Sequence, residues 1–130
     1  MRILIVDDRA DNRELYATYF QIEGFDVDLA SDGEEALRKV DAVMPDVIVM
    51  DLSMPVLDGW ETTRRLKSNP RTAPIPVVVL TAIHEELELA RARAAGANVI
   101  CRKPCLPTEL GARIDEALGA SRSRLKSRRK

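Results

Sequence analysis

The stretch PDVIVMDLSMPVLDG, residues 45–59, contains the pattern that decides the fold. Its apolar run VIVM is too short for a separate helix, and it lies between Pro45 and a segment rich in turn-forming residues. This pattern predicts a strand that is buried on both faces of a parallel sheet. Asp51 ends the strand, at the edge where open α/β folds bind ligands. Asp51 is therefore a candidate site residue, and the alternative is that it only caps the following loop.

Four further apolar runs have the length and composition of strands, and helical patterns separate them. The predicted strands cover residues 2–6, 25–29, 45–51, 75–80 and 97–102, and the predicted helices lie within residues 9–23, 32–40, 60–68, 87–95 and 110–118. Strict alternation of strands and helices predicts a parallel sheet with right-handed crossovers and helices on both faces. We therefore expect a single doubly wound α/β domain of the (βα)5 type.

The predicted helices have apolar faces that should pack against the sheet. These faces are Leu15, Tyr19 and Ile22 in the first helix; Ala36, Leu37 and Val40 in the second; Leu87, Ala90 and Ala94 in the fourth; and Leu110, Ile114, Ala117 and Leu118 in the last. Glycine often follows the last turn of a helix. Gly24, Gly96 and Gly119 are therefore expected to end the first, fourth and fifth helices.

The composition fits one domain with one sizeable core, since 45% of the 130 residues are hydrophobic and 32% are charged. No apolar run approaches the roughly 20 residues that span a bilayer, and the start MRILIVDD lacks the features of a signal peptide. We therefore expect a cytoplasmic protein without membrane contact. Cys101 and Cys105, with a single histidine in the chain, cannot form a four-ligand zinc site, and we expect both thiols to be reduced.

The charge is distributed unevenly along the chain. The net charge is −1, and residues 121–130 contain six Lys/Arg and no acid, which leaves −7 for residues 1–120. We expect residues 120–130 to be a basic, disordered tail or linker. The alternative is a weak electrostatic contact of this tail with nucleic acid or an acidic partner.

Residues that can perform chemistry follow the predicted strands and should meet at one edge of the sheet. They are Asp7 and Asp8 after the first strand, Asp51 after the third, Thr81 after the fourth and Lys103 after the fifth. Three carboxylates in one cleft repel one another, by roughly 4 kcal/mol a pair at about 4 Å and an effective dielectric constant near 20. Mg²⁺, which prefers hard oxygen ligands, would relieve this repulsion together with Lys103. Asp carboxylates can accept phosphoryl groups in such a setting.

At these positions the sequence resembles the receiver domain of two-component response regulators, a CheY-like module. The matching segments are ILIVDD at 3–8, DVIVMDLSMPVLDG at 46–59, PVVVLTA at 76–82 and GANVICRKP at 96–104. The resemblance covers residues 1–119, which we expect to be the receiver domain. It implies a flavodoxin-like sheet with the strand order 2-1-3-4-5.

The resemblance also implies roles for the residues at the sheet edge. Asp51 would accept the phosphoryl group and also bind Mg²⁺, and Asp8 would bind Mg²⁺ directly. Asp7 would act as a ligand mainly through water, and the backbone carbonyl of Ser53 would complete the protein ligands.

The resemblance also implies that Thr81 and Lys103 interact with the phosphoryl group. Thr81 would donate a hydrogen bond to the aspartyl phosphate, and Lys103 would form an ion pair with it. A cis peptide is implied between Lys103 and Pro104.

Three positions depart from the usual pattern of the family. Ile100 stands where an aromatic residue usually reports phosphorylation, and an isoleucine has no ring to swing inward. Ser53 and Ile83 occupy two positions that affect how long the phosphate lasts, and neither side chain is acidic or carries an amide. We therefore predict slow self-dephosphorylation and a changed readout of the phosphorylated state.

The resemblance implies a sensor histidine kinase or a histidine phosphotransfer protein as the phosphoryl donor. It further implies an output protein or domain that binds the surface of the fourth helix, fifth strand and fifth helix. We expect a stoichiometric phosphoacceptor and not a multiple-turnover enzyme. The single histidine, His84, fits a polar residue of an exposed loop better than a phosphohistidine relay.

Three other functions remain as alternatives. A phosphatase of the haloacid-dehalogenase kind would need a second acid two residues after its nucleophile, where this chain has Ser53. A nucleotide-binding module would need a glycine-rich phosphate loop, and the sequence has no G-x-x-x-x-G-K-[ST] segment. A degenerate receiver would act by interaction alone, without phosphorylation, and Ile100 keeps this alternative open.

Overall fold

The computed structural model describes the backbone of residues 1–129 and the side chains of residues 1–119. Within this range, five strands and five helices alternate. The strands are β1 (Arg2–Val6), β2 (Asp26–Ala30), β3 (Val47–Met50), β4 (Val77–Thr81) and β5 (Val99–Arg102). The helices are α1 (Ala10–Ile22), α2 (Gly33–Val43), α3 (Gly59–Ser68), α4 (Glu86–Ala95) and α5 (Pro107–Arg129). Every predicted element is present, with bounds shifted by a few residues except at the end of α5.

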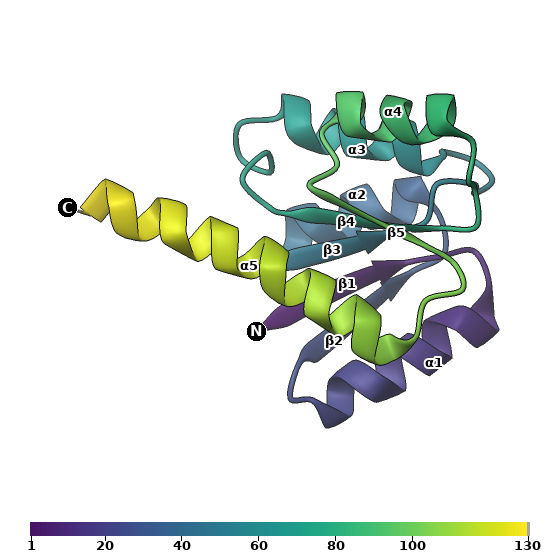
Figure 1. Cartoon of the computed structure of the whole chain (residues 1–130), viewed down its shortest axis with the longest axis horizontal. Coiled ribbons are helices and arrows are strands. Elements are labelled where there is room, and N and C mark those ends of the chain that lie inside the picture. The colour runs from purple at the N-terminus through teal and green to yellow at the C-terminus, as the bar shows by residue number, and fades with distance from the viewer. Residues whose placement is uncertain (130) are drawn as a thin grey trace.

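The five strands form one parallel sheet in the order β2-β1-β3-β4-β5. This order confirms the doubly wound, flavodoxin-like fold that the family resemblance implies. β1 and β3 are direct neighbours, with Val6 opposite Met50 at their ends. Figure 1 shows these two strands pointing toward the same edge of the sheet. We call this edge the carboxyl edge, and residues that follow the strands meet there.

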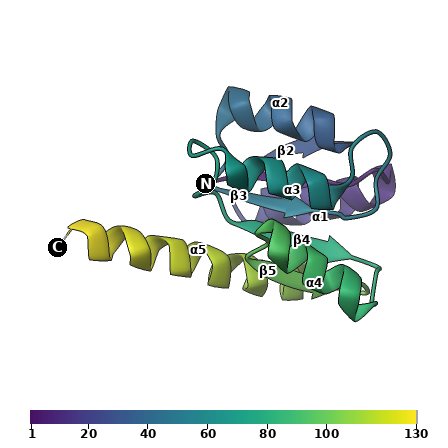
Figure 2. The ribbon, with the colours of Figure 1, turned by 90° about the horizontal axis from the view of Figure 1, so that it is seen from above.

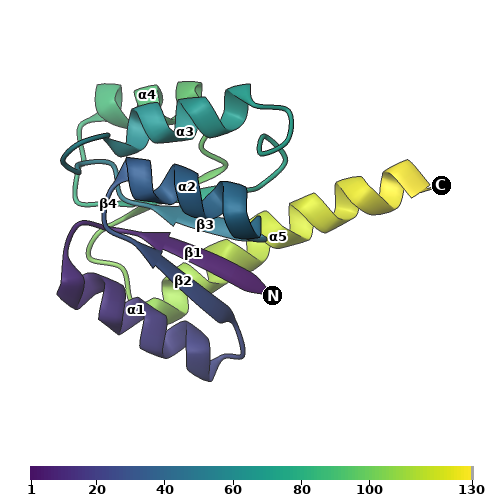
Figure 3. The ribbon, with the colours of Figure 1, turned by 180° about the vertical axis from the view of Figure 1, so that it is seen from behind.

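Helices cover both faces of the sheet, and each face has its own core. Figure 1 shows α5 in front of the sheet, whereas α2 and α3 are in front when the molecule is seen from behind (Figure 3). The core on the side of α1 and α5 contains their side chains Tyr16, Phe20, Leu110, Ile114, Ala117 and Leu118. The core on the other side contains Ala36 and Val40 of α2, Leu66 of α3 and Ala92 of α4.

The predicted apolar face of α1 was wrong for Leu15 and Ile22, whereas Tyr19 is partly buried and packs against the core as predicted. Leu15 and Ile22 are 55% and 78% exposed, and the helix buries Tyr16, Ala17 and Phe20 instead. Apolar residues occur on more than one side of this helix, so their spacing alone does not define the face that packs. The aromatic pair Tyr16 and Phe20, four residues apart, buries more area against the sheet than Leu15 could.

The predicted apolar face of α4 was also wrong. Leu87 is 84% exposed, and Ala90 and Ala94 are exposed as well. The helix packs through Leu89 and Ala92, which lie three residues apart on one side. Alanine occurs all around this short helix, so the sequence gives no dominant apolar stripe. The position of Leu89 decides which side faces the sheet.

α5 continues to Arg129, past Gly119, where the sequence predicted its end. The helix leaves the body of the domain and projects on the side away from the carboxyl edge (Figures 1 and 2). A single glycine costs about 1 kcal/mol in a helix but does not stop it, and no proline follows Gly119. The side chains of residues 120–130 lie outside the described residues, so their assignment as a separate tail stays a prediction. No helix in the described part of the chain is both long enough and apolar enough to cross a membrane.

Both cysteines are free thiols, as expected. Cys101 is buried and Cys105 is half-buried, and both contribute to the core between the sheet and α5. Burial raises the pKa of the Cys105 thiol to about 12, and it also raises the pKa of Cys101. Both side chains therefore stay protonated near neutral pH and act as small apolar residues.

Candidate functional site

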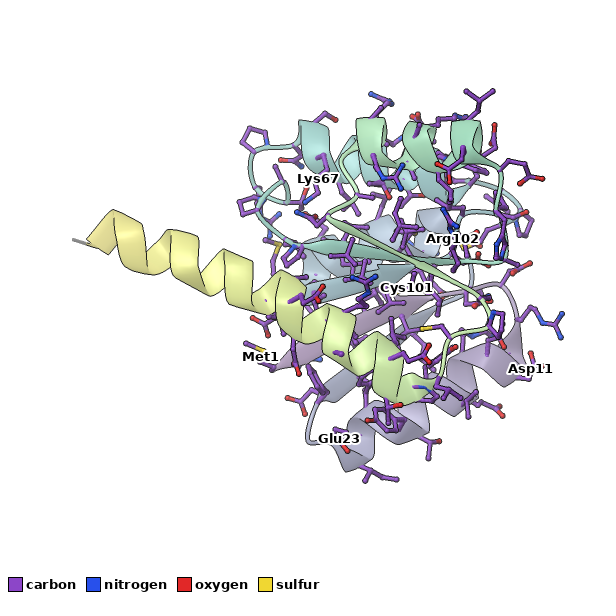
Figure 4. All side chains as sticks on the ribbon, viewed as in Figure 1. Met1, Asp11, Glu23, Lys67, Cys101 and Arg102 are labelled. Carbon is purple, nitrogen blue, oxygen red and sulfur yellow. The ribbon has the colours of Figure 1, made fainter. Side chains whose placement is uncertain are left out.

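The three acidic residues of the predicted site meet at the carboxyl edge of the sheet. One carboxylate oxygen from each of Asp7, Asp8 and Asp51 lies within 4.8 Å of the other two. The parallel pairing of β1 and β3 causes this meeting, since the Asp51 amide donates to the Val6 carbonyl at 2.9 Å, between the strand ends. Figure 4 shows the labelled side chains of Asp11 and Arg102 at this same end of the molecule, with Met1 at the opposite end.

Asp7 is the most deeply buried of these acids and is held by several donors. Its side chain is 4% exposed, and its Oδ1 accepts a hydrogen bond from the Arg9 amide at 2.9 Å. Its Oδ2 accepts from the Lys103 ammonium at 3.3 Å and from the Asn12 amide side chain at 3.4 Å. The Arg13 guanidinium donates to the Asp7 carbonyl at 2.7 Å. Asp7 therefore has a fixed position, and it joins Lys103 to the acidic cluster.

Asp51 is buried next to two other acids, and this shifts its proton affinity. Burial, reinforced by the charges of Asp7 and Asp8, raises the pKa of Asp51 to about 6, although the nearby Lys103 charge lowers it. The residue is 8% exposed, so little of it contacts solvent. The site therefore holds an excess of negative charge, which favours binding of a cation.

The donor set fits a magnesium ion. Asp7, Asp8 and Asp51 offer carboxylate oxygens, which are the ligands that Mg²⁺ prefers, and Asp8 is exposed. The Lys103 ammonium pairs with a carboxylate of this cluster at 3.3 Å and brings one positive charge to three carboxylates. The exposed Asp8 leaves the mouth of the site open for water or substrate oxygens, as an open Mg²⁺ site requires.

Thr81 and Lys103 lie together at the ends of β4 and β5. Thr81 ends β4 with 0% of its surface exposed, and its hydroxyl accepts a hydrogen bond from the Ile83 amide at 3.0 Å. The hydroxyl proton is therefore directed away from that amide and can donate elsewhere. The Lys103 amide donates to the Thr81 carbonyl at 2.7 Å, so the two residues are joined through their backbones. The peptide between Lys103 and Pro104 is cis, as the family resemblance implied.

The connection between β3 and α3 requires a glycine at position 59, which the sequence analysis did not identify. The Gly59 amide donates to the Leu52 carbonyl at 2.8 Å. A Cβ atom at Gly59 would lie 2.1 Å from the Asp51 carbonyl oxygen, so no side chain fits there. Asp58 caps α3, because its side chain accepts from the Glu61 amide at 2.8 Å. The Asp-Gly pair at the start of the helix is the one local signal from which this tight approach could have been predicted.

The sequence of the chain matches the profile of the response regulator receiver domain over residues 3–115. This chain belongs to that family. It is 38% identical over 120 residues to the alkaline phosphatase synthesis transcriptional regulatory protein PhoP of Bacillus subtilis, covering 92% of this chain and 49% of PhoP. It is 36% identical over 113 residues to the response regulator PleD of Caulobacter vibrioides, covering 87% of this chain and 25% of PleD.

Solved receiver structures have the same fold. A response regulator from Chloroflexus aurantiacus aligns with a TM-score of 0.86 and 32% identity, over 91% of this chain and 97% of that one. The signal receiver domain of a histidine kinase from Syntrophus aciditrophicus aligns with a TM-score of 0.85 and 30% identity, over 92% of this chain and 90% of that one. The chain spans about half the length of the first curated relatives that it matches. Receiver domains are signalling modules that interact with histidine kinases and output domains.

The other positions considered in the sequence analysis lie in the loops after β3 and β4 and in β5. Ser53 is exposed in the loop after β3, and the role of its carbonyl stays a prediction. Ile83 and Ile100 are partly buried against the core formed with α2, α3 and α4. His84 is exposed, as expected, but its Nε2 lies 3.0 Å from the Lys103 carbonyl oxygen. No local sequence pattern indicates this contact, because it joins two loops through residues that are 19 positions apart.

Proposed function

We propose that this receiver domain accepts a phosphoryl group on Asp51 in the presence of Mg²⁺. The observation that carries the proposal is the meeting of Asp51 with Asp7, Asp8 and Lys103 at one edge of the sheet. Asp51 is buried, and its pKa of about 6 leaves it mostly ionised at neutral pH and able to attack. The donor would be a sensor histidine kinase or a histidine phosphotransfer protein.

In the proposed reaction, an Asp51 carboxylate oxygen attacks the phosphorus atom of a phosphohistidine. The new O–P bond forms while the N–P bond breaks, and the histidine nitrogen leaves with the bonding electron pair and then takes up a proton. Asp8 would bind Mg²⁺ directly, Asp7 mainly through water and Ser53 through its carbonyl. Bound Mg²⁺ would neutralise oxygens of the transferring phosphoryl group.

Thr81 and Lys103 would stabilise the product. The Thr81 hydroxyl, whose oxygen accepts from Ile83, would donate its proton to a phosphoryl oxygen. The Lys103 ammonium, which contacts Asp7 at 3.3 Å, would turn to the new dianionic group. This movement would reshape the loops after β4 and β5, and so the α4-β5-α5 surface, through which we propose that an output protein or domain binds.

The proposed acceptor acts once for each phosphorylation and is not a multiple-turnover enzyme. Ser53 and Ile83 offer no acid or amide to orient a hydrolytic water, so the phosphorylated state should decay slowly. A phosphoaspartate that disappears within seconds in Mg²⁺ buffer would contradict this part of the proposal.

The experiment is incubation with acetyl phosphate and Mg²⁺, followed by intact mass measurement. We expect one species heavier by about 80 Da, the mass of one phosphoryl group, in the wild type. Asp51→Asn should show no such species, and neither should the wild type in EDTA.

The second candidate is a degenerate receiver that acts through interaction without phosphorylation. The observation that favours it is Ile100, which packs half-buried where the family usually has an aromatic switch residue. A wild-type protein that stays unmodified in the same experiment, yet folds and binds Mg²⁺, would support this candidate.

A further inference from the structure

His84 joins the loop after β4 to the loop after β5. It lies two residues before α4, and its Nε2 is 3.0 Å from the Lys103 carbonyl oxygen. A carbonyl oxygen can only accept, so Nε2 must carry the hydrogen in this contact. His84 therefore donates to the backbone of the residue whose ammonium contacts Asp7.

This bond matters because it is the hydrogen bond that the Lys103 carbonyl accepts. β5 is an edge strand of four residues, and the last pair that joins it to β4 is Thr81 with Arg102. Lys103 comes directly after that pair. Pro104 follows and has no backbone N–H, so the peptide that joins the two residues offers only the Lys103 carbonyl for hydrogen bonding.

The end of β4 and the loop after it therefore each hold one backbone group of Lys103. The Lys103 amide donates to the Thr81 carbonyl at 2.7 Å, and the Lys103 carbonyl accepts from His84 at 3.0 Å. With the backbone held at both points, the ammonium can move between Asp7 and a phosphoryl group without displacement of the main chain. Without His84, the Lys103 carbonyl would lose this donor and only the amide bond to Thr81 would hold the Lys103 backbone directly, so the ammonium would be positioned less precisely.

We propose that His84 is a positioning residue for Lys103 in phosphoryl transfer to Asp51. This inference rests on the proposed function of the site and adds a residue that does not touch the reacting atoms. His84 acts through one hydrogen bond to the backbone. A side chain that can donate from a similar position should replace it, and one that cannot donate should not.

The first test compares phosphorylation rates with acetyl phosphate and Mg²⁺, followed by intact mass. His84→Ala should slow phosphorylation roughly fivefold, because a small misplacement of a catalytic cation weakens transition-state stabilisation. His84→Gln, which keeps an amide donor, should recover most of the rate. Glu85→Ala is the matched control, since Glu85 is an exposed neighbour without a side-chain capping bond, and it should behave like the wild type.

Two further measurements separate positioning from a structural role. The Mg²⁺ affinity and the urea unfolding midpoint of His84→Ala should stay close to those of the wild type, since the acids and the core are not altered. The changes in rate, Mg²⁺ affinity and stability are compared as free energies. A loss of Mg²⁺ affinity or of unfolding free energy as large as the loss in activation free energy would overturn the inference.

The bond itself can be tested without phosphorylation. His84 is the only histidine of the chain, so a long-range proton–nitrogen NMR spectrum of its neutral ring has one set of signals. We expect the tautomer with hydrogen on Nε2, and a ring that carries its hydrogen only on Nδ1 would contradict the inference.

The outcomes also distinguish this inference from the proposed function. If the wild type gains no phosphoryl group, the proposed function fails. If the wild type is phosphorylated and His84→Ala is phosphorylated equally fast, only the positioning role of His84 fails.

Discussion

The loops that follow β3 and β4 lie on two sides of the site and are held very differently. After β3, the Gly59 amide bonds to Leu52, and the Asp58 side chain caps the first turn of α3. After β4, the N-cap of α4 is Glu85, which makes no side-chain capping bond, and residues 84–87 are all exposed. The proposed nucleophile therefore belongs to the rigid side, and the groups that would respond to phosphorylation belong to the looser side.

The connection between α3 and α4 fits this division. The Trp60 ring nitrogen donates to the Glu88 carbonyl at 3.0 Å, and the Arg91 guanidinium lies 4.6 Å from the ring centroid. These contacts hold the middle of α4 against α3. The first turn of α4 and the preceding loop are held instead by exposed contacts, the ion pair of Glu86 with Arg102 at 2.7 Å and the contact of His84 with the Lys103 carbonyl at 3.0 Å. Elements with few stabilising contacts are those that open or shift at low cost.

The largest expected effect is at the rigid loop. Gly59→Ala would place a methyl group 2.1 Å from the Asp51 carbonyl oxygen, a contact that backbone atoms cannot relieve without moving. We expect a loss of about 3 kcal/mol in the free energy of unfolding, measured by urea denaturation. Gly119→Ala is the control, since no atom lies within 4 Å of its Cβ position, and it should be neutral or stabilising. Equal effects of the two variants would show that the loop after β3 is not rigid.

The second effect concerns the burial of the Asp51 carboxylate, to which the charges of Asp7 and Asp8 add. Its pKa rises from 3.8 to about 6 on folding, so the folded state holds this proton more tightly than the unfolded state. The stability that this gives is complete below pH 3.8 and is lost as the pH rises through about 6. Asp51→Asn removes this titration. As the pH rises from 4 to 7.5, we expect the free energy of unfolding of Asp51→Asn to increase by about 2 kcal/mol relative to that of the wild type.

The measurement is urea unfolding of both proteins across this pH range in EDTA. Added Mg²⁺ should stabilise the wild type at pH 7.5 and have little effect on Asp51→Asn, because the ion favours the charged carboxylate. A difference in unfolding free energy between the two proteins that stays constant at all pH values would contradict the raised pKa of the buried Asp51 carboxyl group.

The third effect compares the two helix starts directly. Asp58→Ala removes the cap of α3 and should cost about 1 kcal/mol of unfolding free energy. Glu85→Ala at the same position of α4 should change stability by only a few tenths of a kcal/mol, because no capping bond is lost. Thermal unfolding of both variants tests the comparison, and a larger loss for Glu85→Ala would reverse it.

The smallest effect is at the link between the two helices. Trp60→Phe keeps an aromatic ring under Arg91 but removes the hydrogen bond to Glu88, so we expect a loss of about 0.5 kcal/mol. Hydrogen exchange followed by mass spectrometry should show faster exchange in α4 and unchanged exchange in the loop after β3. Faster exchange in both regions would mean that they are one cooperative unit.

The fold and the meeting of the site residues could be predicted because both follow from strand patterns. Buried apolar runs such as 47–50 are recognisable locally, and a parallel sheet brings the residue after each strand to one edge. The apolar faces of α1 and α4 were not predictable from spacing. Several stripes were available, and packing against the sheet selected Phe20 and Leu89 over Leu15 and Leu87.

The finer contacts of the site depend on loop geometry that no local pattern encodes. The contact of Lys103 with Asp7 spans 96 residues, and that of His84 with Lys103 joins two loops. The end of α5 was missed for a different reason, since Gly119 weakens the helix without stopping it.

The most direct test of the central claim is to locate the phosphoryl group. After treatment with acetyl phosphate and Mg²⁺, borohydride reduces an aspartyl phosphate to homoserine, and peptide sequencing by mass spectrometry identifies the residue. We predict homoserine at position 51 and unchanged aspartates at positions 7 and 8. Homoserine at Asp7 or Asp8, or unmodified aspartate at all three positions, would contradict the account.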